Sequence, residues 1–137
     1  MKLSDLASAL SLYTLGAIGV GCGTRSTDCN LTTIPCSCDR RTLSSPDCRD
    51  YEGVSVASAT SKCSTASGTF SSTALCTTTS RAGTCREVFG TTVNNYRYYI
   101  ANYSTAASGA GACEYVNANC LVVSLGAACS AAWTSDI

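Results

Sequence analysis

Histidine is absent from this 137-residue chain, and charged side chains are scarce. Without histidine, the Ser–His and Cys–His pairs that activate most nucleophiles cannot form. Carboxylates are the remaining acid–base groups, and beyond residue 52 they are only Glu87, Glu114 and Asp136. We interpret Glu87 and Glu114 as surface residues rather than a catalytic pair. The sequence therefore predicts a protein that is not an enzyme and that uses no cofactor.

An excess of positive charge is also missing. Charged residues make up 13% of the chain and their formal charges sum to zero. Binding to nucleic acid or to an anionic membrane surface relies on a basic patch, and none is present. We therefore exclude nucleic acid as a partner. The low charge instead favours close packing between subunits, because little self-repulsion opposes it.

The common spacings of metal and redox cysteines do not occur. The nearest pair is Cys36 and Cys38, and there is no C-x-x-C pair among the eleven cysteines. This spacing, together with the lack of histidine, argues against zinc-finger, thioredoxin-like and c-type haem sites. A metal or iron–sulfur site with cysteine ligands alone is the alternative. We predict no metal site.

Large apolar side chains are few, whereas Ser, Thr, Ala and Gly dominate. Small side chains bury little apolar area, so the core should be thin. Disulfides, each contributing about 2–4 kcal/mol, would then stabilise the fold, and they form in an oxidising compartment. We predict a small β-rich α+β domain in the extracellular space or cell envelope. The ten cysteines assigned to disulfides are Cys29, Cys36, Cys38, Cys48, Cys63, Cys76, Cys85, Cys113, Cys120 and Cys129.

Residues 1–21 contain the only sustained apolar run. One interpretation is a secretory signal, with Lys2 as its charged end. The other is a retained helix capped by Ser4, which at ~1.5 Å per residue would be about 27 Å long over residues 3–20. Such a helix could anchor the protein in a membrane or drive its assembly. Its assembly stripe would consist of Leu6, Leu10, Tyr13 and Ala17.

Because eleven is odd, at least one cysteine has no partner within the chain. Cys22 is the candidate, since it follows the apolar run among small residues, as in a bacterial lipoprotein signal. Lipidation of Cys22 is one interpretation. An intermolecular disulfide at Cys22, or internal pairing that leaves another thiol free, is the alternative.

The rest of the chain divides at residue 50. Residues 22–50 hold both prolines and eight of the 18 charged residues, and they predict a loop-rich segment without regular strands or helices. Residues 51–137 predict a β-rich domain, in which 54–90 and 103–137 form two degenerate half-repeats. Short helices are expected at 54–62 and 105–112, and strands at 68–73, 75–79, 84–89, 94–103 and 121–125.

Tyrosines concentrate in the strand expected at 94–103. Alternation places Tyr96, Tyr98 and Ile100 on one face of that strand. The other face would carry Arg97, Tyr99, Ala101 and Tyr103. A tyrosine strand suits a ligand-binding platform, although such rings more often cover a small core or a subunit interface.

The order of cysteines and aromatics resembles a known module. The stretch from Cys63 to Cys113 contains Gly68-Thr-Phe-Ser, Leu75-Cys76, Gly83-Thr-Cys85, Tyr96-Arg-Tyr-Tyr99 and Ala106-Ala107. It resembles the cysteine-rich modules of exported lipoproteins from spirochaetes and deltaproteobacteria, whose function is mostly unassigned. The resemblance covers about half the chain and implies a bacterial envelope or surface location, with Cys22 as the lipidated residue.

Together these features predict a non-catalytic structural protein of the extracellular space or cell envelope. It would self-assemble, for example into a filament, through its apolar helix and its low-charge β-surface. One alternative is a secreted or lipid-anchored binding module that uses Tyr96, Tyr98, Tyr99 and Tyr103. Another is a secreted disulfide-rich effector.

Overall fold

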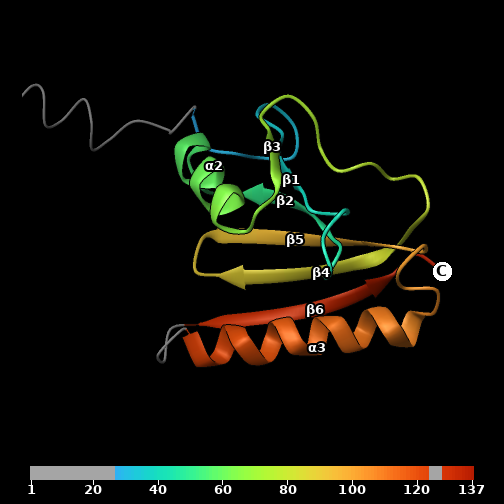
Figure 1. Cartoon of the computed structure of the whole chain (residues 1–137). Helices are drawn as coiled ribbons and strands as arrows, with labels where there is room; N and C mark the ends of the chain where they lie inside the picture. The colour runs from blue at the N-terminus through green and yellow to red at the C-terminus, as the bar shows by residue number, and fades with distance from the viewer. Residues whose placement is uncertain (1–26, 124–127) are drawn as a thin grey trace, which may run out of the picture.

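The computed structural model describes residues 27–123 and 128–137 (Figure 1). The predicted N-terminal helix and Cys22 lie outside these residues. The described chain is a small β-rich domain with two helices, as predicted. Its elements are β1 (Cys36–Asp39), β2 (Cys48–Glu52), α2 (Val56–Thr65), β3 (Thr69–Ser71), β4 (Arg81–Phe89), β5 (Thr92–Tyr99), α3 (Ala106–Val123) and β6 (Cys129–Ser135).

The six strands form one antiparallel sheet in the order β3-β1-β2-β5-β4-β6. Its centre is the long β4–β5 hairpin, in which Phe89 pairs with Thr92 across a tight turn. Gly90 occupies this turn with φ +59°, a conformation that glycine adopts without a steric penalty. Pairing of β2 with β5 joins the short N-terminal strands to this hairpin.

The half of the sheet formed by β1, β2 and β3 is held by cystines. Helix α2 is capped by Ser55, whose hydroxyl accepts a hydrogen bond from the Ser58 amide at 3.1 Å. Its buried Cys63 bonds to Cys38 of β1. The core of this half consists of four half-cystines and three further residues: Cys29, Cys36, Cys38, Cys63, Tyr51, Val54 and Ala59.

Aromatic packing dominates the half formed by β4, β5 and β6. Helix α3 packs on β4 and β6, and the Cys85–Cys113 disulfide ties it to β4. The Trp133 ring lies so close to Gly83 and Gly109 that neither position has room for a Cβ atom. In the described part of the chain, no helix combines the length and the apolar character needed to cross a bilayer.

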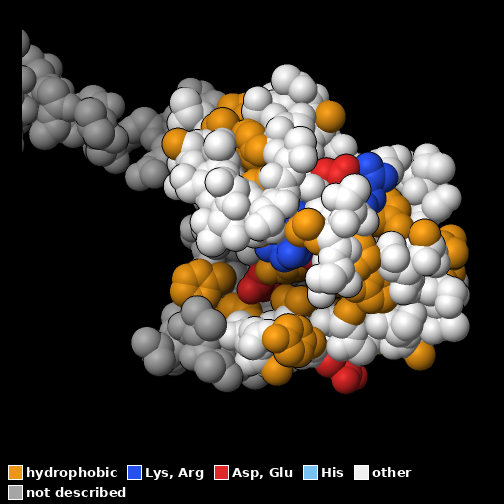
Figure 2. Space-filling model, viewed as in Figure 1, with side chains coloured by type: hydrophobic (Ala, Val, Ile, Leu, Met, Phe, Trp, Pro, Cys, Tyr) orange, Lys and Arg blue, Asp and Glu red, His pale blue; other side chains and the backbone are white. Residues whose placement is uncertain are grey.

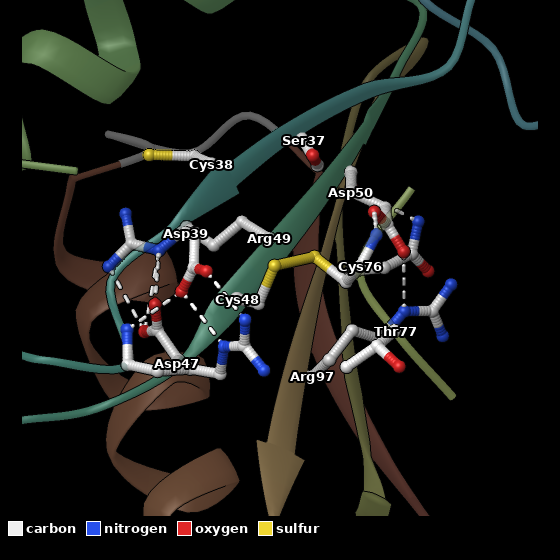
Figure 3. The surroundings of a disulfide bond; sticks show 12 residues. Ser37, Cys38, Asp39, Asp47, Cys48, Arg49, Asp50, Cys76, Thr77 and Arg97 are labelled. Carbon is white, nitrogen blue, oxygen red and sulfur yellow. Dashed lines mark hydrogen bonds and ion pairs between the residues drawn. A yellow bond between two sulfur atoms is a disulfide. The ribbon is translucent and has the colours of Figure 1, made fainter. Parts of the chain in front are cut away.

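The loop between β3 and β4 lies against one face of the sheet. The Cys48–Cys76 disulfide anchors it, and the Cys76 amide donates a hydrogen bond to the buried Asp50 carboxylate at 2.8 Å (Figure 3). Arg97 of β5 donates to the same carboxylate at 2.9 Å. The Tyr99 hydroxyl donates to the Thr77 carbonyl at 2.9 Å. This face is therefore covered where β2 and β5 meet.

Three predictions about local structure are wrong. Strands β1 and β2 begin within residues 22–50, where no regular strand was expected, because half-cystines rather than an apolar alternation bury them. Residues 75–79 contain no strand, since they cross the sheet face as the anchored loop. Residues 121–123 continue α3 instead of starting a strand, because the helix that begins at Ala106 runs on through them.

The other expected helices and strands are present with shifted boundaries. The helix expected at 105–112 runs over Ala106–Val123, and the strands expected at 68–73 and 84–89 are Thr69–Ser71 and Arg81–Phe89. The helix expected at 54–62 runs over Val56–Thr65 and includes Cys63. The strand expected at 94–103 is Thr92–Tyr99. Residue 50, the predicted segment boundary, falls inside β2, so both segments contribute to one sheet. The half-repeats stay a prediction.

Candidate functional site

The two helices cover the same face of the sheet and leave a groove between them. One row of directly opposed residues crosses β1, β2, β5, β4 and β6 in that order: Cys38, Arg49, Tyr96, Cys85 and Trp133. Opposed residues of antiparallel strands point to the same face. Disulfides join Cys38 to α2 and Cys85 to α3, so both helices lie on this face. Arg49 and Tyr96 remain between them as the floor of the groove.

The groove has a volume of about 680 Å³. Figure 2 shows hydrophobic, basic and acidic side chains gathered in this hollow between α2 and α3. A smaller hollow of about 450 Å³ continues from it toward α2. The two share the residues Arg49, Lys62, Glu87, Asn94 and Tyr96.

Glu87 is held in place on the floor. The Tyr96 hydroxyl donates to its Oε2 at 2.7 Å, and the Asn94 amide donates to the same oxygen at 3.0 Å. The Arg49 guanidinium stacks on the Tyr96 ring, 4.7 Å from its centroid. These contacts fix the carboxylate, the phenol and the guanidinium as one rigid polar surface.

Two polar atoms of the floor lack a hydrogen-bond partner within the described chain. They are the Tyr51 hydroxyl, on a side chain that is only 1% exposed, and Oδ1 of Asn94. Arg49 lies near the Tyr51 hydroxyl but outside hydrogen-bonding geometry. Both residues line the hollow beside α2. Because an unpaired buried polar group costs about 1–3 kcal/mol, water or a ligand is expected to meet these atoms.

The opposite wall and the rim are aromatic. Tyr103 packs on Tyr98 with ring centroids 4.6 Å apart. Tyr115 of α3 is 72% exposed and Phe89 is 47% exposed, and both line the groove. Their ring faces are available to a bound molecule.

The charges that line the groove nearly cancel. Asp47 pairs with Arg40 at 2.9 Å and with Arg49 at 3.3 Å. Lys62 of α2 and Glu87 of β4 also face the groove. Three basic groups therefore accompany two acidic groups, and both arginines already have a partner.

The phenols of the groove keep their protons. Burial raises the pKa of Tyr96 above its ordinary value, and its hydrogen bond to Glu87 raises it further. Burial also raises the pKa of Tyr98. The Tyr96 hydroxyl, which donates to Glu87, therefore serves as a hydrogen-bond donor.

The structure brings together three of the four predicted tyrosines. Tyr96, Tyr98 and Tyr103 line the groove. Tyr99 lies on the opposite face, in a buried cluster with Cys48 and Cys76. Tyr103 was expected beside Tyr99, but the chain turns after Tyr99 and returns Tyr103 to the ring of Tyr98.

Several groove residues were not predicted from the sequence. Glu87 was interpreted as a surface residue, yet it accepts two hydrogen bonds inside the groove. Arg49, Tyr51 and Tyr115 were not singled out. Strand alternation within 48–52 would have placed Arg49 and Tyr51 on one face, had that strand been recognised.

One group in the described chain has the geometry of metal ligands. Glu87 lies near Cys120 and Cys129, with the three ligand atoms within 4.8 Å of one another. Because Cys120 and Cys129 form a disulfide, their sulfur atoms are not available as thiolate ligands. The cluster therefore supports no metal site in the oxidised protein.

All ten cysteines of the described chain are paired. The pairs are Cys29–Cys36, Cys38–Cys63, Cys48–Cys76, Cys85–Cys113 and Cys120–Cys129. Five disulfides in so small a domain point to an oxidising, extracellular or exported compartment. The proposed roles of Cys22 and of the stripe Leu6, Leu10, Tyr13 and Ala17 fall outside the described residues. Comparison with protein-family models, curated proteins and solved structures gave no match to this chain.

Proposed function

We propose that this protein is an exported, non-catalytic binding module whose ligand lies in the groove between α2 and α3. The observation that carries the proposal is the unpaired polar floor, where the Tyr51 hydroxyl and Asn94 Oδ1 have no partner in the described chain. Pockets that bind small molecules combine apolar and aromatic walls with a few fixed polar groups. This groove has both features.

The groove is suited to binding rather than to catalysis. Its acid, Glu87, already accepts hydrogen bonds from Tyr96 and Asn94. Its phenols keep their protons because burial raises the pKa of Tyr96 and Tyr98. A lipid anchor at Cys22, as the lipoprotein resemblance implies, would hold such a module at the cell surface.

Self-assembly through the sheet has less support. An open strand edge is the usual route by which one sheet joins another. At the β6 edge, the Ala131 amide donates to Oδ1 of Asn117 at 2.8 Å, so α3 covers part of that edge. The other edge strand, β3, has only three residues. Assembly through residues 1–21 stays a prediction.

The test is an NMR screen of the oxidised full chain against a library of saccharides, amino acids, short peptides, nucleosides and fatty acids. We expect at least one class to shift the amide signals of Glu87, Tyr96 and Tyr115. Tyr115→Ala should weaken that binding, whereas Tyr99→Phe, on the opposite face, should not. Shifts confined to other surfaces, or no shifts with any class, would contradict the proposal.

A further inference from the structure

The groove presents side chains of a kind that recognises hydroxyl groups. We propose that its ligand is an uncharged saccharide chain, an inference that rests on the binding function proposed above. The chemistry of the floor, the charge balance and the exposed rings each support this assignment.

The floor matches a ligand whose polar groups both donate and accept. Asn94 Oδ1 needs a donor, and the Tyr51 hydroxyl can donate or accept. Glu87 accepts, and Arg49 donates. A hydroxyl group can pair with each of these four groups, because it acts as donor and acceptor, and it supplies the partner that Asn94 Oδ1 and the Tyr51 hydroxyl lack. Neighbouring hydroxyls on a sugar ring also fit the planar amide, carboxylate and guanidinium groups, which present two atoms at once.

The charge balance disfavours a strongly charged ligand. Asp47 already pairs with Arg40 and Arg49, and Lys62 and Glu87 contribute opposite charges. A polyanion would meet Asp47 and Glu87, and a polycation would meet the three basic groups. In either case, part of the charge transferred from water would remain unpaired, which is unfavourable.

The rim supplies ring faces for the apolar side of a sugar. Tyr115 is 72% exposed and Phe89 is 47% exposed. The C–H groups of a pyranose ring form a flat apolar surface that packs on such a ring face. Aromatic side chains provide this contact area with little loss of conformational entropy.

A peptide ligand fits these observations less well. Extended peptides commonly bind by adding a strand to a sheet edge, where main-chain groups provide the affinity. The floor of this groove is a sheet face, and part of the β6 edge is covered because Asn117 accepts the hydrogen bond of Ala131. Side-chain contacts alone would have to hold the peptide.

The experiment titrates the oxidised full chain with three matched panels. These are neutral oligosaccharides of hexoses and N-acetylhexosamines, sulfated or uronate oligosaccharides, and uncharged peptides of similar length. We expect a neutral oligosaccharide to bind and to shift the amides of Glu87, Tyr96 and Tyr115. Tyr115→Ala should weaken its binding roughly fivefold, because an aromatic contact of this kind contributes on the order of 1 kcal/mol.

Tyr51→Phe separates a ligand contact from a structural role. It removes a hydroxyl that has no partner in the fold, so the midpoint of thermal unfolding should stay the same or rise. Binding of the saccharide should nevertheless weaken. If the midpoint falls and binding is unchanged, the hydroxyl has a structural role and the proposed contact between it and the saccharide is wrong.

The outcomes separate this inference from the proposed function. Binding of peptides or anionic oligosaccharides in the groove, without the neutral ones, would overturn the saccharide assignment and leave the binding module intact. Failure of all three panels would also overturn the assignment. The broader library screen then decides the binding function on its own.

Discussion

The two halves of the sheet differ in the side chains that form their cores. Strands β1, β2 and β3 have three to five residues each, and four half-cystines fill the core beneath α2. Strands β4, β5 and β6 have seven to nine residues, and beneath α3 the single buried cystine Cys85–Cys113 packs with Tyr98 and with the partly buried rings of Tyr103 and Trp133. The short strands bury one large ring, Tyr51, and cystine sulfur supplies most of the remaining core there.

The candidate site lies where these halves meet. Arg49 of β2 and Tyr96 of β5 are paired across the junction and form the groove floor. On the opposite face, Asp50 and Arg97 form a buried ion pair between the same strands. The groove therefore depends on both halves keeping their positions.

The largest effect is expected from removing the cystine beneath α2. The disulfides Cys38–Cys63 and Cys85–Cys113 close loops of similar length, with sequence separations of 25 and 28. Each should contribute about 3–4 kcal/mol through the unfolded state. Cys38→Ala/Cys63→Ala should lower the free energy of unfolding by more than this, about 4–5 kcal/mol in all, because this cystine is also part of the core beneath α2.

Urea unfolding of the oxidised variants measures this difference. The matched Cys85→Ala/Cys113→Ala variant retains Tyr98, Tyr103 and Trp133 and should lose only about 3 kcal/mol. Equal losses, or a greater loss in the matched variant, would show that the halves are not held differently.

The ion pair at the junction should come next. Asp50 is 1% exposed, and Arg97 is its partner at 2.9 Å. Arg97→Met leaves the carboxylate buried without a positive partner and should lower the free energy of unfolding by about 3 kcal/mol. Asp50→Asn/Arg97→Met removes both charges, and its free energy of unfolding should fall by clearly less. A double variant as unstable as the single one would mean that the charge pair is not the cause.

The smallest effects test the packing beneath α3. A Cβ atom at Gly109 would collide with the Trp133 ring, whereas a Cβ atom at Gly111, two residues later in the same helix, would meet nothing within 4 Å. Gly109→Ala should lower the free energy of unfolding by about 1–3 kcal/mol. Gly111→Ala should raise it by about 1 kcal/mol, the ordinary gain in helix propensity. Chemical denaturation measures both, and a gain at Gly109 would mean that Trp133 is loosely packed.

The same contrast explains what could be predicted from the sequence. The disulfides, the oxidising compartment and the β-rich α+β class follow from composition, because small side chains cannot build a large core. The tyrosine strand follows from alternation, and two of its tyrosines share a face as expected. These features depend on local pattern or on residue counts.

The remaining features depend on contacts that no local pattern records. Strands β1 and β2 show no alternation of large apolar residues. In β1 the buried positions are instead occupied by the half-cystines Cys36 and Cys38. Arg49 and Glu87 look like surface charges in sequence, and only the order β2-β5-β4 brings them to one floor. Tyr103 reaches Tyr98 through a turn that its spacing from Tyr99 did not indicate. Strand order and disulfide pairing therefore determine the site.

The most direct test of this account is the disulfide map of the native protein, obtained by peptide mass spectrometry under denaturing, non-reducing conditions together with thiol titration. We expect the five pairs described above, with Cys38 joined to Cys63, and at most one titratable thiol per chain. Several free thiols, or Cys38 and Cys63 joined to other partners, would contradict it.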